Sequence, residues 1–119
     1  MQTETLTSLV VEALEGLKGR DITTMDVSEL TNVTDVMIVV SGTSSRHINA
    51  LANAVVVDVK ANGLQPIGVE GKQGSEWVLV DLGDVVVHVM TPDTRALYDL
   101  ERLWSDLPSD TDRESRVRH

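Results

Sequence analysis

Hydrophobic and polar positions follow two periods along this chain, one typical of helices and one typical of strands. Apolar side chains recur with the i, i+3, i+4, i+7 spacing of a helix face in residues 5–18 and again in residues 45–61. Gly19 follows the first stretch and Asn62-Gly63 the second, and both are typical helix ends. We therefore predict two helices with these bounds, each with one buried face.

Shorter apolar segments predict strands. Residues 36–40 (VMIVV) form a continuous apolar run, which is typical of a strand buried on both faces. Residues 22–27 and 66–70 fit shorter strands, and the polar segment 28–35 fits a loop. The succession of strand 36–40, helix and strand 66–70 favours a right-handed parallel crossover.

Residues 76–81 and 84–90 predict a hairpin that turns around Leu82-Gly83 after a polar turn at 71–75. The second strand is apolar on both faces apart from His88, so we predict that it is central. The pairing register of the two strands depends on the length of the turn, and two turn lengths are possible. A two-residue turn would pair Trp77 with His88 on one face, whereas a three-residue turn with a bulge at Gly83 would place them on opposite faces.

The segment Thr91-Pro92-Asp93 predicts a helix start, because Thr can cap, Pro fits the first position and Asp suits the helix dipole. The predicted helix carries Leu97, Leu100, Leu103 and Trp104 on one side and Tyr98, Glu101 and Arg102 on an adjoining side. We predict one domain over residues 1–107 and a disordered, charged tail over 108–119.

Charge narrows the classes of partner. The chain has 119 residues and a net charge of −9, which argues against naked nucleic acid and against an anionic membrane surface. A basic protein partner is compatible with this charge, as is an ordinary acidic cytosolic protein. The N-terminus lacks the features of a signal peptide, and no apolar run reaches the roughly 20 residues that span a bilayer. We expect a cytoplasmic protein.

Several residues could carry chemistry, but each has a simpler interpretation. The small-residue loop 41–47, with Arg46 and His47, could bind a phosphate at a helix N-terminus. It contains neither GxGxxG nor a Walker lysine, so capping of the helix by Thr43, Ser44 or Ser45 is favoured.

His88 could be a general base or a metal ligand, although a half-buried, hydrogen-bonded histidine is the favoured interpretation. Asp81 and Asp84 could hold magnesium, but aspartates are ordinary in turns. The chain has no cysteine, which removes disulfides, zinc–thiolate sites and cysteine nucleophiles. We predict no catalytic site, no metal and no cofactor.

The aromatic residues favour a binding function. The chain has no phenylalanine, and all its aromatic side chains, Trp77, Tyr98 and Trp104, lie between residues 77 and 104. Tyr98 beside Glu101 resembles an interface hot spot for a basic partner. The alternative is that both tryptophans close the core, and for Trp77 the two interpretations are equally supported.

Four segments in this order resemble the ribosomal silencing factor family, also called Iojap-like. They are Asp35 with VMIVVSGTSSRH (36–47), GVEG (68–71), WVLVDLGDVVVHVM (77–90) and RALYDLERLW (95–104). The resemblance spans residues 6–104. It implies a single α/β domain with a mixed sheet of about five strands flanked by helices. That fold is similar to nucleotidyltransferases without their catalytic carboxylates, and no GS motif closely followed by DxD or DxE occurs after Gly42 here.

The resemblance also implies a non-enzymatic function. Members bind ribosomal protein fourteen of the large subunit, block joining of the small subunit and lower translation in starvation or stationary phase. They are linked to late large-subunit assembly, and they often form homodimers. The positions that match the family's contacts are Trp77, Asp81, His88, Tyr98, Leu100, Glu101, Leu103 and Trp104. Two alternatives remain: a nucleotidyltransferase-like or phosphate-binding enzyme that uses loop 41–47, and a purely structural homodimer.

Overall fold

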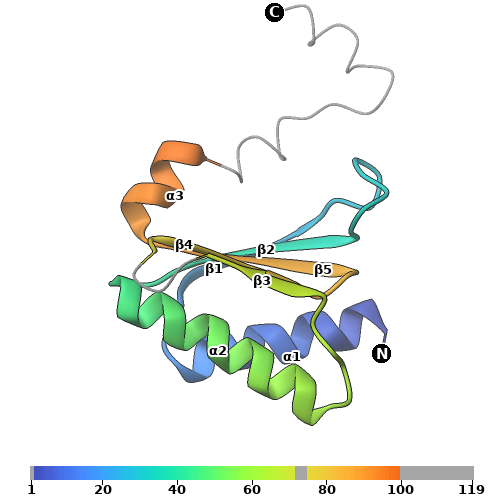
Figure 1. Ribbon diagram of the computed structural model, residues 1–119. Helices are drawn as coiled ribbons and strands as arrows, with labels where there is room; N and C mark the ends of the chain where they lie inside the picture. The colour runs from blue at the N-terminus through green and yellow to red at the C-terminus, as the bar shows by residue number, and fades with distance from the viewer. Residues whose placement is uncertain (1, 72–74, 100–119) are drawn as a thin grey trace, which may run out of the picture.

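The computed structural model describes residues 2–71 and 75–99. The elements in chain order are α1 (Thr3–Gly16), β1 (Arg20–Asp26), β2 (Val36–Ser41), α2 (Ser45–Ala61), β3 (Gly68–Glu70), β4 (Trp77–Asp81), β5 (Val85–Met90) and α3 (Pro92–Tyr98). Helices α1 and α2 lie on one side of the sheet and α3 lies on the other (Figure 1). Within residues 2–71 and 75–99, one face of the sheet is therefore covered by two helices and the other by a short helix near its end.

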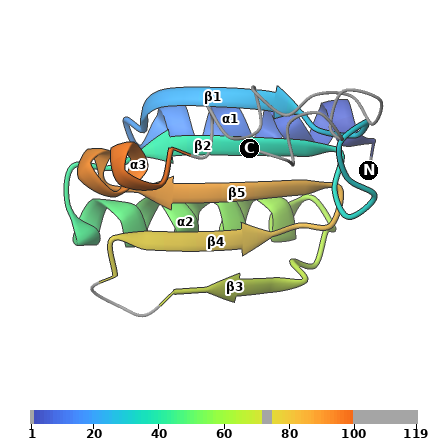
Figure 2. The same ribbon diagram turned by 90° about the horizontal axis from the view of Figure 1, so that it is seen from above.

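The five strands form one mixed sheet in the order β1-β2-β5-β4-β3. Strands β2 and β5 are parallel, and the other three neighbouring pairs are antiparallel. Figure 2 shows this order from the side of α3. The predicted α/β fold with a mixed sheet is confirmed, and so is the central position of the second hairpin strand, β5.

The connection through α2 crosses most of the sheet. The strand pairings make β3 parallel to β2, as a parallel crossover requires, but β5 and β4 lie between them. The two strands are not neighbours because β4 pairs with both β3 and β5, so the hairpin occupies the intervening positions. Helix α2 runs behind β5 and β4 (Figure 2).

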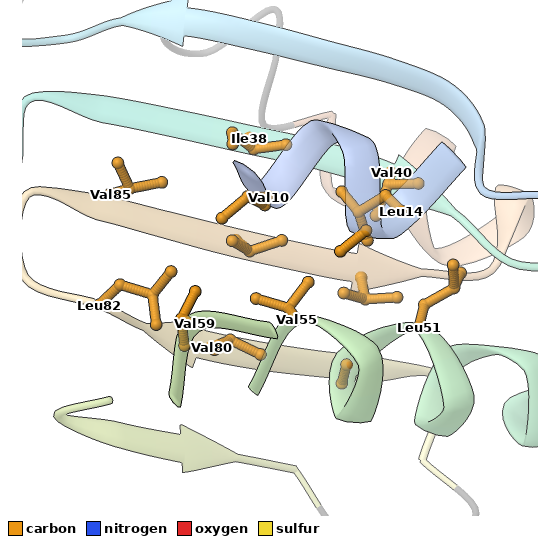
Figure 3. Close-up of a cluster of buried hydrophobic side chains, with 14 of the residues drawn as sticks. Val10, Leu14, Ile38, Val40, Leu51, Val55, Val59, Val80, Leu82 and Val85 are labelled. Carbon is orange, nitrogen blue, oxygen red and sulfur yellow. The ribbon is translucent and has the colours of Figure 1, made fainter. Parts of the chain in front are cut away.

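The main core lies between the two long helices and the sheet. Figure 3 shows aliphatic side chains from all these elements meeting there. Its fully buried members include Val10, Leu14, Ile38, Val40, Ile48, Leu51, Val55, Val59, Val80, Val85, Val87 and Val89. Both predicted helix stripes point into it, because each helix buries one face against the strands.

A second, smaller cluster lies on the opposite face of the sheet. Val27, Met37, Val39 and Met90 are buried there, with Trp77 and Met25 partly buried beside them. Strand β2 therefore contributes to both clusters, which confirms the prediction that it is buried on both faces.

The boundaries of α2 have clear local causes. The helix spans Ser45–Ala61, as predicted, and the side chain of Ser44 accepts a hydrogen bond from the backbone N–H of His47. Gly63, just beyond the helix, has a φ of +88°, which favours glycine. At the other end, a side chain on Gly42 would approach Ile48 Cγ1 to 2.9 Å, so glycine allows the close approach of loop and helix.

The hairpin has a two-residue turn, as one of the two predictions required, but the turn lies one residue later in the chain than predicted. Gly83 and Asp84 form the turn between Leu82 and Val85, which are joined by a hydrogen bond of 2.9 Å from the N–H of Leu82 to the carbonyl of Val85. Gly83 takes the positive φ of +90°, so Leu82 avoids it and remains buried. Trp77 therefore pairs with Met90 rather than with His88.

Helix α3 begins as predicted and ends earlier. Thr91 caps it and Pro92 occupies its first turn. It ends at Tyr98, because Asp99 adopts the left-handed conformation with a φ of 48°, which a short polar side chain tolerates. The predicted continuous helix to residue 104 is therefore wrong at Asp99. Leu97 is also 77% exposed rather than part of a buried stripe. Residues 100–119 and 72–74 lie outside the described residues.

Candidate partner-binding face

The face of the sheet opposite α1 and α2, called here the open face, carries the candidate residues of β4 and β5. The register of β4 and β5 places Val78, Val80, Val85, Val87 and Val89 toward the helices. The alternate residues therefore lie on the open face, since side chains alternate along a strand. They are Trp77, Leu79 and Asp81 from β4 and Val86, His88 and Met90 from β5.

Three of the predicted contact residues form one cluster on this face. The indole Nε1 of Trp77 donates a hydrogen bond to Nδ1 of His88 at 3.1 Å. The ring of Tyr98 also contacts Trp77, with ring centroids 4.7 Å apart and an interplanar angle of 49°. The tilted geometry is favourable for aromatic pairs. Trp77 is half-buried and Tyr98 is 53% exposed.

The strand register explains how Trp77 meets His88. Leu79 pairs directly with His88, and Trp77 pairs with Met90, so Trp77 and His88 are diagonal neighbours. Aromatic side chains can bridge that separation. Trp77 and His88 share a face, as the two-residue turn predicts, although they are not directly paired.

The environment of His88 makes it a structural histidine. Burial lowers its pKa from 6.5 to about 4, because an imidazolium would lose hydration there. Its Nδ1 accepts the hydrogen bond from Trp77, so the neutral ring carries its proton on Nε2. The half-buried, hydrogen-bonded interpretation is confirmed. With that lone pair engaged, Nδ1 is not available as a base or a metal ligand.

Asp81 lies at the other end of the open face and does not join the cluster. It is four residues from Trp77 along β4, which corresponds to about 13 Å. Its Oδ1 accepts a hydrogen bond of 2.9 Å from the N–H of Gly83, so its carboxylate stabilises the turn. Within residues 2–71 and 75–99, no three His, Asp or Glu side chains are close enough to hold a metal ion.

The sequence did not reveal the role of Arg95. Its guanidinium donates to Oγ of Ser41 at 2.9 Å and to Oγ1 of Thr23 at 3.0 Å, and it thereby attaches α3 to β2 and β1. The partners are 54 and 72 residues away in the chain, so no local pattern could indicate them. The only signal is an arginine four residues after a helix cap, which is too common to be informative.

Loop 41–47 uses its polar groups within the fold. Ser44 is the helix cap, which confirms the favoured interpretation. Nδ1 of His47 accepts from the N–H of Thr43 at 2.9 Å, and its Nε2 bonds the carbonyl of Leu17 at 2.8 Å. Ser41 is buried and bonded to Arg95. No contact in this loop favours a phosphate site.

The remaining predicted contact residues, Leu100, Glu101, Leu103 and Trp104, lie outside the described residues. None of the helices that the structure describes is long and apolar enough to cross a membrane. What the described residues present is a surface with a partly exposed aromatic cluster, suited to binding a macromolecule.

These features define an α/β protein whose candidate site is a binding face. The sequence model of a family described as "Ribosomal silencing factor during starvation" matches residues 1–119, and the chain belongs to this family.

Relatives and a solved structure agree. The chain is 50% identical over 104 residues to a ribosomal silencing factor from Chromobacterium violaceum, with 87% of this chain and 85% of that protein covered. It is 35% identical over 100 residues to mouse "Mitochondrial assembly of ribosomal large subunit protein 1", with 82% and 44% covered. A crystal structure of a Chromobacterium violaceum protein superposes with a TM-score of 0.86 at 49% identity, and 92% of each chain is covered. The resemblance stated from the sequence is therefore confirmed.

Proposed function

We propose that this protein is a translational repressor. It binds the large ribosomal subunit through ribosomal protein fourteen and blocks association with the small subunit. In this way it lowers translation during starvation or stationary phase. Family membership over the whole chain supports the proposal. A role in large-subunit biogenesis is part of it, because the mouse relative is named for assembly of that subunit.

The observation that carries the proposed binding site is the partly exposed cluster of Trp77, His88 and Tyr98 on the open face. A tilted stack of large rings offers contact area at a small cost in side-chain entropy, and such residues dominate interface energetics. We include Asp81 on the same face, and the four predicted residues beyond position 99, as proposed contacts.

The proposed mechanism is occlusion, which requires affinity and bulk rather than reactive groups. A domain of this length is about 28 Å across, twice the expected radius of gyration. A net charge of −9 favours a basic ribosomal protein and disfavours nonspecific adhesion to ribosomal RNA. We propose a cytoplasmic location, no cofactor and no enzymatic activity. We also propose that the protein forms a homodimer away from the ribosome.

A subunit-joining assay tests the function and the site together. Purified large and small subunits are mixed with the wild type, with Tyr98→Ala, or with Val57→Ala, and are separated on sucrose gradients. Val57 is a matched control, because it is also 53% exposed and lies on α2, on the far side of the sheet.

The expected result is that the wild type and Val57→Ala migrate with the large subunit and reduce the joined peak. Tyr98→Ala should bind at least tenfold more weakly, a loss of about 1.4 kcal/mol that is typical of an interface anchor. If Tyr98→Ala acts like the wild type, the function stands and the site is wrong. If the wild type neither migrates with the large subunit nor reduces joining, the proposed function fails.

A further inference from the structure

The β1–β2 loop (residues 27–35) carries an exposed apolar side chain that the proposed site does not include. Val33 is 82% exposed, the highest value among the large hydrophobic side chains of the described residues. The loop lies on the same side of the sheet as α3 (Figure 1) and at the opposite end of the open face (Figure 2). An apolar side chain in this position contributes nothing to the core and is available for contact with a partner.

The loop is held in place rather than loosely attached. Its ends are joined by a hydrogen bond of 2.9 Å from the N–H of Val27 to the carbonyl of Asp35. Val27 and Thr34 are buried, and the N–H groups of Asp35 and Val36 both bond the carbonyl of Asp84 in the hairpin turn. Oγ1 of Thr31 accepts from the N–H of Val33 at 3.1 Å. The loop therefore presents Val33 at little entropic cost, as compact functional loops do.

The charge around Val33 indicates the kind of partner. Asp26, Glu29, Asp35 and Asp84 are exposed. The backbone hydrogen bonds from Val27 to Asp35 and from Asp35 to Asp84 hold the loop against the hairpin turn at one end of the sheet. Residues 21–45 contain no lysine or arginine. Two hydrogen bonds from Ser28 lower the pKa of Asp26, so this carboxylate stays charged. An apolar side chain among carboxylates matches a basic protein surface with an apolar pocket, whereas RNA would be repelled.

The geometry allows one partner to reach both ends of the open face. The six residues of β2 separate the loop from the α3 end, which corresponds to about 20 Å. A standard protein interface covers about 800 Å² on each partner, or roughly 30 Å across. Both ends fit beneath one such interface.

We propose that Val33 and the acidic β1–β2 loop form a second contact with the same basic ribosomal protein, so that the interface spans the open face from α3 to this loop. The proposal rests on the proposed function and extends its site to residues that the sequence had indicated only as a polar loop.

The test compares Val33→Ser with Val57→Ser in titrations of purified large subunits and of isolated ribosomal protein fourteen. Both positions are exposed, so both variants should fold, which thermal melting verifies. We expect Val33→Ser to bind both targets about tenfold more weakly and Val57→Ser to bind like the wild type. A further variant, Glu29→Gln with Asp84→Asn, should bind more slowly and with a weaker dependence on salt.

Three outcomes overturn the inference and leave the proposed function intact. The first is that Val33→Ser binds like the wild type. The second is that Val33→Ser loses affinity only for whole subunits, which would indicate contact with RNA or another protein. The third is that Val33→Ser changes only the mass of the protein in solution, which would indicate contact with a second copy of the chain. If the wild type binds neither target, the proposed function itself has failed.

Discussion

The two faces of the sheet use the same strands for different purposes. Toward α1 and α2, strands β4 and β5 present only valines, and the core they build is aliphatic. Toward the open face, the alternate residues are Trp77, Leu79, Asp81, Val86, His88 and Met90. The first face stabilises the fold by burying apolar area. The second keeps polar groups and rings partly accessible, which a binding face requires.

The helices on the two faces are attached in different ways. Helix α2 buries five side chains: Ile48, Leu51, Ala52, Val55 and Val59. Helix α3 has no buried residue. It is held by the guanidinium of Arg95, by the hydrogen bond of Thr91 to Glu76 and by the stacking of Tyr98 on Trp77. These few contacts contribute less than the apolar packing of α2, so α3 should detach before the core unfolds.

The largest effect should come from the helix-covered face. Leu51 is fully buried, and Leu51→Ala should lower the free energy of unfolding by about 2–5 kcal/mol, because it leaves a cavity. Leu97→Ala, at an exposed position on α3, should change it by less than about 0.5 kcal/mol. Urea unfolding followed by circular dichroism measures both. Similar losses for the two variants would contradict the division between the faces.

The next effect depends on pH and concerns the open face. The pKa of His88 is about 4 in the folded protein and 6.5 in the unfolded chain. Between these values the unfolded chain binds a proton that the folded state does not, so stability falls as pH drops from 6.5 to about 4. The contribution is on the order of 3 kcal/mol, at 1.36 kcal/mol per unit of pKa.

His88→Asn isolates this contribution. Its side-chain oxygen can accept the hydrogen bond from Trp77 without titrating. Urea midpoints of both proteins are compared between pH 7 and pH 4.5. We expect the wild type to lose more stability than the variant over this interval. Equal losses would show that His88 does not supply the pH dependence.

The smallest effect should come from the attachment of α3. Arg95→Ala removes two hydrogen bonds from a charged group and should cost about 1–2 kcal/mol, less than a core cavity. It should also weaken the contact between the rings of Trp77 and Tyr98, measured as the nuclear Overhauser effect between them. Arg46→Ala, at an exposed position at the start of α2, is the control and should leave this signal unchanged. An unchanged signal in Arg95→Ala would show that α3 stays in place without the guanidinium of Arg95.

Local sequence patterns predicted the helices and strands well, because apolar stripes and helix caps act over only a few positions in the chain. The apolar stripe with Ser44 before it and Gly63 after it defined α2 to the residue. The hairpin turn could not be placed, since Gly83 can take the positive φ as the first or second residue of a two-residue turn. The end of α3 was missed because Asp99 is an acceptable helix residue by composition, yet it adopts a left-handed conformation.

The candidate site depended on contacts between distant residues. The sequence singled out Trp77, His88 and Tyr98 individually, but only the register and the position of α3 show that they touch. The attachment of Arg95 to two different strands had no signal in the sequence at all. Contacts between side chains that are distant in the sequence depend on the order of the strands, and the periodicity of the sequence does not determine that order.

The central claim is that the open face, rather than the helix-covered side, meets the ribosome. Because the chain has no cysteine, one can be introduced at Leu97 or at Val57 and alkylated with and without large subunits. Both positions are exposed, and mass spectrometry of this protein gives the two rates. We expect large subunits to slow alkylation of Leu97→Cys at least tenfold and to leave Val57→Cys unchanged. Protection of Val57→Cys with no protection of Leu97→Cys would contradict the account.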